Sequence, residues 1–150
     1  MAELSPEWRK TELEYEKAIG KFVANFSRLE YGLRRLMCQY FDDKADCAGM
    51  LIEHCDLMKL IDGYRLMLEA TRLDADGKIE GFIKEFRKIN EARVRIVHGT
   101  WLPNKDGFGA WKTPSGNPKS GQMIYFTSLA ELDALAKRCF NLAIEVWGKV

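Results

Sequence analysis

Apolar residues in the first third of the chain recur at helical spacing. The start signal Ser-Pro-Glu at 5–7 offers a cap, a proline for the first turn and a carboxylate facing the positive end of the helix dipole. One long helix is therefore predicted from there to about Phe41. Its apolar positions are Ile19, Phe22, Val23, Phe26, Leu29, Leu33, Leu36, Met37 and Tyr40. Gly20 and Gly32 interrupt this pattern without a proline, so each indicates either a close helix contact or a slight bend.

Three further segments show helical periodicity. A short helical turn is predicted over 45–52, and longer helices over 56–73 and 78–98, with a turn at 74–77 between the two longer ones. The core candidates are Leu57, Leu60, Ile61, Tyr64, Leu66, Met67 and Leu68 in the first of these longer helices, and Ile79, Phe82, Ile83, Phe86, Ile89 and Val97 in the second. Gly99 is the predicted C-terminal cap.

The segment 99–127 differs in character because it is rich in glycine and proline. Its extended pieces are 100–102, 108–111 and 123–126, and turn sequences join them. This pattern predicts a small β-hairpin or three-stranded flap inserted before the last helix. Trp101, Trp111 and Tyr125 would either cover the core side of that sheet or offer a platform on which bases stack.

The last helix begins with a capping box, Ser128 to Glu131. Its apolar face consists of Leu129, Leu132, Leu135, Ala136, Phe140, Ala143, Ile144 and Trp147. The fold expected for residues 1–150 is therefore one domain, mainly all-α, with four to five helices in a bundle and the flap at 99–127.

Composition narrows the class of protein. The chain is 47% hydrophobic and 30% charged with a net charge of +1, which is typical of a globular domain and gives no support for a general duplex-DNA binder. No apolar run approaches the roughly 20 residues that span a bilayer, and the polar N-terminus does not resemble a secretory peptide. Cys38, Cys47, Cys55 and Cys139 form no Cys-x-x-Cys pair. We expect a cytoplasmic protein with reduced thiols, no membrane contact, no metal and no cofactor.

Three polar residues occupy positions where helical spacing calls for apolar ones. Glu30 falls in the stripe of the first helix, and Asn90 and Arg93 fall in the stripe of the helix over 78–98. Buried charge is costly unless it is paired. One interpretation is that the two helices pack together and Glu30 meets Arg93, with Asn90 completing the hydrogen bonds. The alternative is that these side chains lie at the edge of a stripe and reach water.

His98 lies about 140° around the helix from Arg93 and is its last residue. Histidine there suits proton transfer, although it could simply interact with the last carbonyls and the negative end of the helix dipole. Arg95 shares the His98 face, where it would be an extra phosphate contact or part of an exposed salt-bridged surface.

Residues 93–99, Arg-Val-Arg-Ile-Val-His-Gly, resemble the signature of the HEPN superfamily of helical proteins. That signature is an arginine, four to six variable residues and a histidine, often written Arg-Asn-x-x-x-His. Residues 26–30 and 99–101 also resemble bacterial and phage members of the superfamily. Val94 stands where the motif often has asparagine, and Asn90, one turn earlier, lies on the Arg93 side of the helix.

The resemblance carries expectations about activity. Many HEPN proteins are metal-independent endoribonucleases that act as homodimers in toxin–antitoxin and defence systems, with the arginine and histidine at the dimer interface. Others have lost catalysis and bind a protein partner or a nucleotide. The resemblance therefore implies an RNA substrate, a homodimer and an antitoxin or other protein partner, or alternatively an inactive HEPN-like binding or scaffold module.

Metal-free RNA cleavage needs one group that moves a proton and one cation that stabilises charge on the phosphate. His98 would be the general acid or base, and Arg93 would hold the phosphate. Glu30 and Asn90 would orient Arg93, and Arg95 would add a phosphate or RNA contact.

Overall fold

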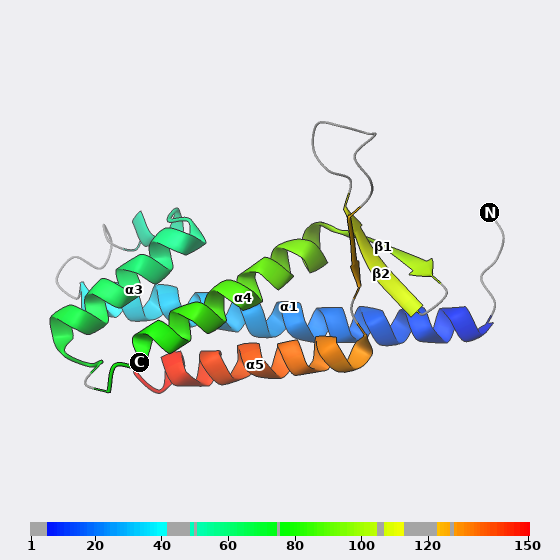
Figure 1. The fold of residues 1–150 in the computed structure, drawn as a ribbon. Helices are drawn as coiled ribbons and strands as arrows, with labels where there is room; N and C mark the ends of the chain where they lie inside the picture. The colour runs from blue at the N-terminus through cyan, green and yellow to red at the C-terminus, as the bar shows by residue number, and fades with distance from the viewer. Residues whose placement is uncertain are drawn as a thin grey trace.

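The computed structural model describes residues 6–41, 49, 51–74, 76–104, 107–112, 123–126 and 128–150. They form the elements α1 (Pro6–Tyr40), α3 (Leu57–Thr71), α4 (Ile79–His98), β1 (Thr100–Asn104), β2 (Gly107–Lys112), β3 (Met123–Phe126) and α5 (Leu129–Trp147). The prediction of a mainly helical bundle with a small sheet before the last helix is confirmed. α1 runs the length of the molecule, α5 lies along it, the sheet packs at its N-terminal end and α3 lies towards its other end (Figure 1).

Helix boundaries follow the sequence signals closely. α1 is continuous through both Gly20 and Gly32. A β-carbon on Gly32 would lie 3.0 Å from Nε1 of Trp147, whereas one on Gly20 would have no neighbour within 4 Å. Gly32 therefore marks a close helix contact. The cap at position 5 lies outside the described residues.

The segment before α3 is described only in part. Residues 49 and 51–53 are helical, in agreement with the predicted turn, while 45–48 and 50 lie outside the described residues. The Asp56 side chain caps α3 by accepting a hydrogen bond of 3.0 Å from the backbone N–H of Lys59. The helix ends at Thr71, and its C-cap Arg72 takes a left-handed conformation with φ of 57°.

α4 ends at His98 as predicted, but Gly99 does not form the usual left-handed cap. Its backbone is extended, with φ −82° and ψ 146°. A β-carbon there would lie 2.6 Å from the carbonyl oxygen of Arg95 and 2.7 Å from the Ala110 side chain. Glycine is therefore required by the close approach of β2 to the end of α4.

The sheet is antiparallel, in the order β1-β2-β3. Thr100 pairs with Trp111 in the first ladder, and Gly109 pairs with Phe126 in the second. Of the two arrangements predicted for this segment, a hairpin or a three-stranded flap, the three-stranded one is present. The link over 113–122 lies outside the described residues.

Aromatic side chains fasten the sheet to α1. Phe108 packs against Trp8 and Tyr15 with ring centroids 5.9 Å and 5.4 Å apart, and Trp101 lies 6.1 Å from Tyr15. The Trp101 indole N–H also donates a hydrogen bond of 2.9 Å to the carbonyl oxygen of Ile96. Trp101 thus covers the core side of the sheet. The side chains of Trp111 and Tyr125 lie outside the described residues.

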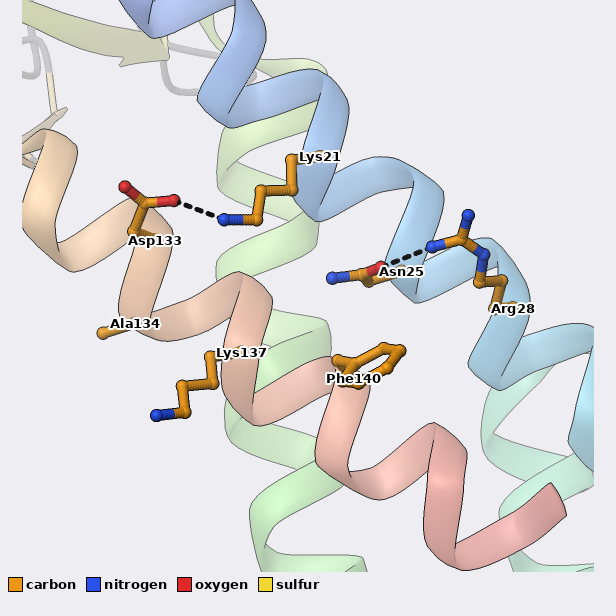
Figure 2. A pocket seen from close by; sticks show the side chains of 7 residues that line it. All are labelled: Lys21, Asn25, Arg28, Asp133, Ala134, Lys137 and Phe140. Atoms are coloured by element: carbon orange, nitrogen blue, oxygen red, sulfur yellow. Dashed lines mark hydrogen bonds and ion pairs between the residues drawn. The ribbon is translucent and has the colours of Figure 1, made fainter.

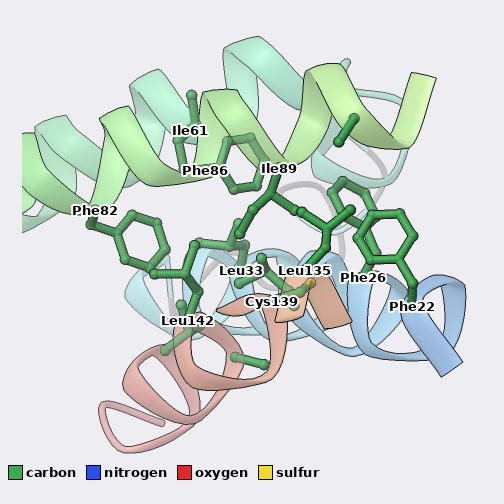
Figure 3. Packing of buried hydrophobic residues seen from close by; sticks show 14 of the residues in the cluster. Phe22, Phe26, Leu33, Ile61, Phe82, Phe86, Ile89, Leu135, Cys139 and Leu142 are labelled. Atoms are coloured by element: carbon green, nitrogen blue, oxygen red, sulfur yellow. The ribbon is translucent and has the colours of Figure 1, made fainter. Parts of the chain in front are cut away.

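All four long helices contribute to one core (Figure 3). It includes Phe22, Phe26 and Leu33 of α1, Ile61 of α3, Phe82, Phe86 and Ile89 of α4, and Leu135, Cys139 and Leu142 of α5. Some predicted core positions are exposed instead: Val23, Tyr40, Leu66, Val97, Phe140, Ile144 and Trp147. Each apolar stripe is wider than the face that neighbouring helices cover, so its edges reach solvent. None of the described helices combines the length and apolarity needed to cross a membrane.

Candidate arginine–asparagine site

The predicted contact between Glu30 and Arg93 is absent. Glu30 instead pairs with Arg34 on the next turn of α1, its Oε1 lying 2.6 Å from Nη2 and 3.2 Å from Nε of that arginine. The i,i+4 partner wins because it is already adjacent on the same helix surface, so no second helix has to supply the cation. The expectation that Glu30 orients Arg93 is therefore wrong.

Arg34 has a structural task that sequence reasoning did not assign. Its guanidinium donates to the carbonyl oxygens of Ile52, Glu53 and Cys55, the last two at 3.2 Å. These carbonyls belong to the helical turn at 51–53 and its exit, where the Ile52 carbonyl oxygen also accepts a hydrogen bond of 3.2 Å from the backbone N–H of Cys55. Glu30 and Arg34 thus tie α1 to the segment that leads into α3.

Arg93 contacts α1 one turn before Glu30. Its guanidinium carbon lies 5.1 Å from the centroid of the Phe26 ring, a cation–π contact. Its Nε donates a hydrogen bond of 3.1 Å to Oδ1 of Asn90. Phe26 in turn packs against Phe86 with ring centroids 6.2 Å apart. Arg93 therefore lies in the seam between α1 and α4, as the stripes indicated, with Asn90 and an aromatic ring in place of a carboxylate.

The Arg93 fork is held on one side only. It is half-buried, and no described side chain forms a hydrogen bond with Nη1 or Nη2. Two parallel N–H donors are the geometry that recognises a phosphate or a carboxylate. The arrangement leaves those donors for such a ligand.

His98 and Arg95 are exposed near the end of α4, and Val94 is half-buried. Five residues of helix separate Arg93 from His98, a rise of about 7.5 Å, and the two positions point to different sides of α4. A single chain therefore does not present the two side chains on one face.

A second asparagine–arginine pair, which sequence reasoning missed, lies in α1. Asn25 is the one buried polar side chain among the described residues. Its Nδ2 donates 3.0 Å to the carbonyl oxygen of Ala136, and its Oδ1 accepts 2.8 Å from Nη1 of Arg28. Both pairs have asparagine at i and arginine at i+3, a spacing that sequence inspection alone can find.

Arg28 lines an open groove of about 560 Å³ between α1 and α5 (Figure 2). The lining residues are Lys21, Asn25, Arg28, Asp133, Ala134, Lys137 and Phe140. Lys21 and Asp133 form an exposed ion pair at 2.9 Å across it. The groove carries more positive than negative charge, although the whole chain is nearly neutral.

No metal-ligand cluster of three or more histidine, cysteine or acidic side chains occurs within the described part of the chain. Comparison with protein-family models, with curated proteins and with solved structures finds no match. The resemblance of residues 26–30 and 93–101 to the HEPN superfamily therefore stays a prediction from the sequence.

Proposed function

We propose that this protein is a metal-independent endoribonuclease of the HEPN type. The observation that carries the proposal is Arg93, a guanidinium held at Nε by Asn90 and supported by the Phe26 ring, with both terminal nitrogens left for a ligand. Such a fork suits the non-bridging oxygens of an RNA phosphate, where negative charge grows in the transition state.

In the proposed reaction the ribose 2′-oxygen attacks the adjacent phosphorus and the 5′-oxygen leaves, giving a 2′,3′-cyclic phosphate. His98 would take the proton from the 2′-hydroxyl or supply one to the leaving oxygen. Its exposed place at the end of α4 gives access to a large substrate. Asn90 would act as a positioning residue, because its Oδ1 holds Nε of Arg93.

A homodimer completes the proposed site. Arg93 and His98 point to different sides of α4, so the two do not meet within one chain, and a two-fold pairing of these helix ends would supply the His98 of one copy to the Arg93 of the other. The pairing would also double the positive charge that faces RNA there, including Arg95, which compensates for the nearly neutral chain.

The test uses the chain's two histidines as a matched pair. Pure protein is incubated in EDTA with single-stranded and structured RNA, alongside His98→Ala, Arg93→Ala and His54→Ala variants. We expect cleavage by the wild type and by His54→Ala, cyclic phosphate ends on the products, and loss of cleavage in the other two. Equal cleavage by all four proteins would identify a contaminating nuclease, and no cleavage by any of them would reject the proposal.

A second candidate function is that of a catalytically silent HEPN-like module that binds a protein partner. Val94 follows the arginine in place of the usual asparagine, and large apolar side chains are exposed on α5, away from Arg93. Absence of RNA cleavage by the wild type, together with partner binding that His98→Ala and Arg93→Ala retain, would favour this candidate.

A further inference from the structure

The outer side of α5 carries an apolar stripe that no described element covers. Phe140, Ile144 and Trp147 follow each other at i, i+4 and i+7 and are 44%, 54% and 39% exposed. Tyr31 of α1 is 56% exposed, and its ring centroid lies 5.8 Å from that of Trp147. We call these four residues the α5 stripe. Contiguous exposed apolar side chains of this size are typical of a contact surface.

The α5 stripe is held in place. The Trp147 indole N–H donates a hydrogen bond of 3.3 Å to the carbonyl oxygen of Arg28. A β-carbon at Gly32 would come within 3.0 Å of the indole nitrogen and 3.3 Å of the Val146 side chain. The absence of that carbon lets the indole lie against α1. An aromatic side chain fixed in this way loses little entropy when a ligand covers it.

Positive charge borders one end of the stripe. Phe140 is also a wall of the groove that contains Lys21, Arg28 and Lys137, and its ring lies beside the Asn25–Arg28 pair (Figure 2). Asn25 fixes the Arg28 guanidinium by a bond of 2.8 Å and is itself anchored to α5 through the carbonyl oxygen of Ala136. A buried amide destabilises the fold unless its hydrogen bonds are made. The hydrogen bonds of Asn25 are made, and one of them directs the Arg28 guanidinium into the open groove.

We propose that the groove and the α5 stripe together bind an acidic amphipathic helix of another protein. An apolar helix face would cover the stripe with side chains at the same spacing of three and four residues. Carboxylates near one end of that helix would pair with Arg28 and Lys137. This surface is formed by α1 and α5, whereas Arg93 lies between α1 and α4, so the proposal does not depend on ribonuclease activity.

Charge and shape distinguish this occupant from two others. A second copy of the chain would bring the same groove, whose one lining carboxylate, Asp133, is already paired with Lys21. RNA would use the cations and could stack on aromatic rings, but it would not need Ile144, the most exposed residue of the stripe on α5. An acidic helix uses both the cations and the aliphatic side chain.

The experiment selects binders from a display library of helical peptides in which one face is randomised. We expect enriched peptides to carry apolar residues three and four apart, with aspartate or glutamate towards one end. Their affinity should fall at least about tenfold with Ile144→Asp and with Arg28→Glu, a typical loss for an interface anchor. The matched controls are Leu66→Asp, an exposed leucine on α3, and Lys84→Glu, an exposed lysine on α4, which should bind as the wild type does.

Each other outcome overturns the proposal. These outcomes are a selection without enrichment, enriched peptides that are not acidic, and peptides that bind Ile144→Asp unchanged. Wild-type self-association abolished by Ile144→Asp in light scattering would show that a second copy covers the stripe. Loss of single-stranded RNA binding in Arg28→Glu, without peptide enrichment, would assign the groove to nucleic acid. Circular dichroism of every variant establishes that each one is folded.

Discussion

Glu30 and Arg34 form a carboxylate–guanidinium pair within one helix, with Oε1 and Nη2 2.6 Å apart on adjacent turns of α1. The Arg34 guanidinium also donates hydrogen bonds to carbonyl oxygens of the segment before α3. Glu30 therefore supports a connection between helices and has no part in holding Arg93. Replacing Glu30 or Arg34 by alanine should therefore lower the free energy of unfolding by different amounts.

Glu30→Ala should reduce the free energy of unfolding by less than about 1 kcal/mol, because the pair is partly exposed and its loss strands no buried charge. Arg34→Ala should cost about 2 kcal/mol, since several carbonyl oxygens lose a charged donor. Urea unfolding followed by circular dichroism measures both. A loss near 3 kcal/mol for Glu30→Ala, the size expected for a stranded buried arginine, would contradict this account.

The contact between Arg93 and Phe26 should appear as a coupling energy. Phe26→Leu and Arg93→Met each keep most of the side-chain volume, and their double-mutant cycle isolates the cation–π term. We expect a coupling of about 0.5–1 kcal/mol in urea unfolding, as for a half-buried cation over a ring at 5.1 Å. Strict additivity of the two changes would show that the guanidinium does not rest on this ring.

Gly99→Ala should destabilise the junction between α4 and the sheet by about 2 kcal/mol. The new β-carbon would meet the Arg95 carbonyl oxygen at 2.6 Å and the Ala110 side chain at 2.7 Å, and neither is a flexible tip. Gly81→Ala is the matched control because it lies inside α4 with no neighbour within 4 Å of the new carbon, so it should be neutral or stabilising by about 0.5–1 kcal/mol. Thermal unfolding compares the two. Equal effects would mean that β2 does not approach Gly99.

Cys139 should resist alkylation in the folded protein. Burial raises its pKa to about 12, so almost none of the reactive thiolate is present at pH 8. Cys38 and Cys55 are half-buried and should react with iodoacetamide before Cys139 does. Peptide mapping after timed labelling gives the order, and urea should remove the protection of Cys139. Early labelling of Cys139 without denaturant would show that its core position is open.

The ion pair between Glu85 and Arg138 should make stability depend on pH. The hydrogen bond from Arg138 lowers the Glu85 pKa below its ordinary value of 4.5. A lowered carboxylate pKa stabilises the fold above the unfolded-state value, and this contribution disappears as the pH falls through the folded-state value.

The wild type should therefore be more stable than Glu85→Gln by up to about 1 kcal/mol near pH 7, because the pair is partly exposed. The gap should close below pH 4.5, where the folded carboxylate becomes protonated. Urea unfolding of both proteins at several pH values checks this. A gap that widens on acidification would have the wrong sign for this ion pair.

Periodicity predicts the fold well because it records which face of each helix must be buried. Capping signals then fix the ends, as the box at Ser128 and the side-chain cap at Asp56 show. The edges of the stripes were less well predicted. Ile144 and Val97 share the spacing of core residues, yet no neighbouring helix covers them. Helical periodicity gives the direction in which a side chain points, whereas its burial depends on where the neighbouring helices lie.

The sequence predicts where Arg93 lies better than it predicts which side chains Arg93 contacts. The stripes correctly place Arg93 against α1, but they do not tell which α1 side chain it meets. Glu30 lies on the predicted face of α1, but its carboxylate forms an ion pair with Arg34 on the next turn of the same helix. The local i,i+3 and i,i+4 pairs are visible in sequence, and they account for the contacts of Asn90 and Asn25 with arginine. The approach of Ala110 to Gly99 depends on the three-dimensional path of the sheet and leaves no such signal.

The 35 residues of α1 form a rod about 52 Å long. Near its N-terminal end Trp8 packs against the ring of Phe108, and near its C-terminal end Arg34 donates to the carbonyl oxygen of Cys55. Measured from its midpoint, a tilt of about 5° would carry either tip roughly 2 Å. A small change in the angle between α5 and α1, which pack along each other, would thus displace both ends of α1.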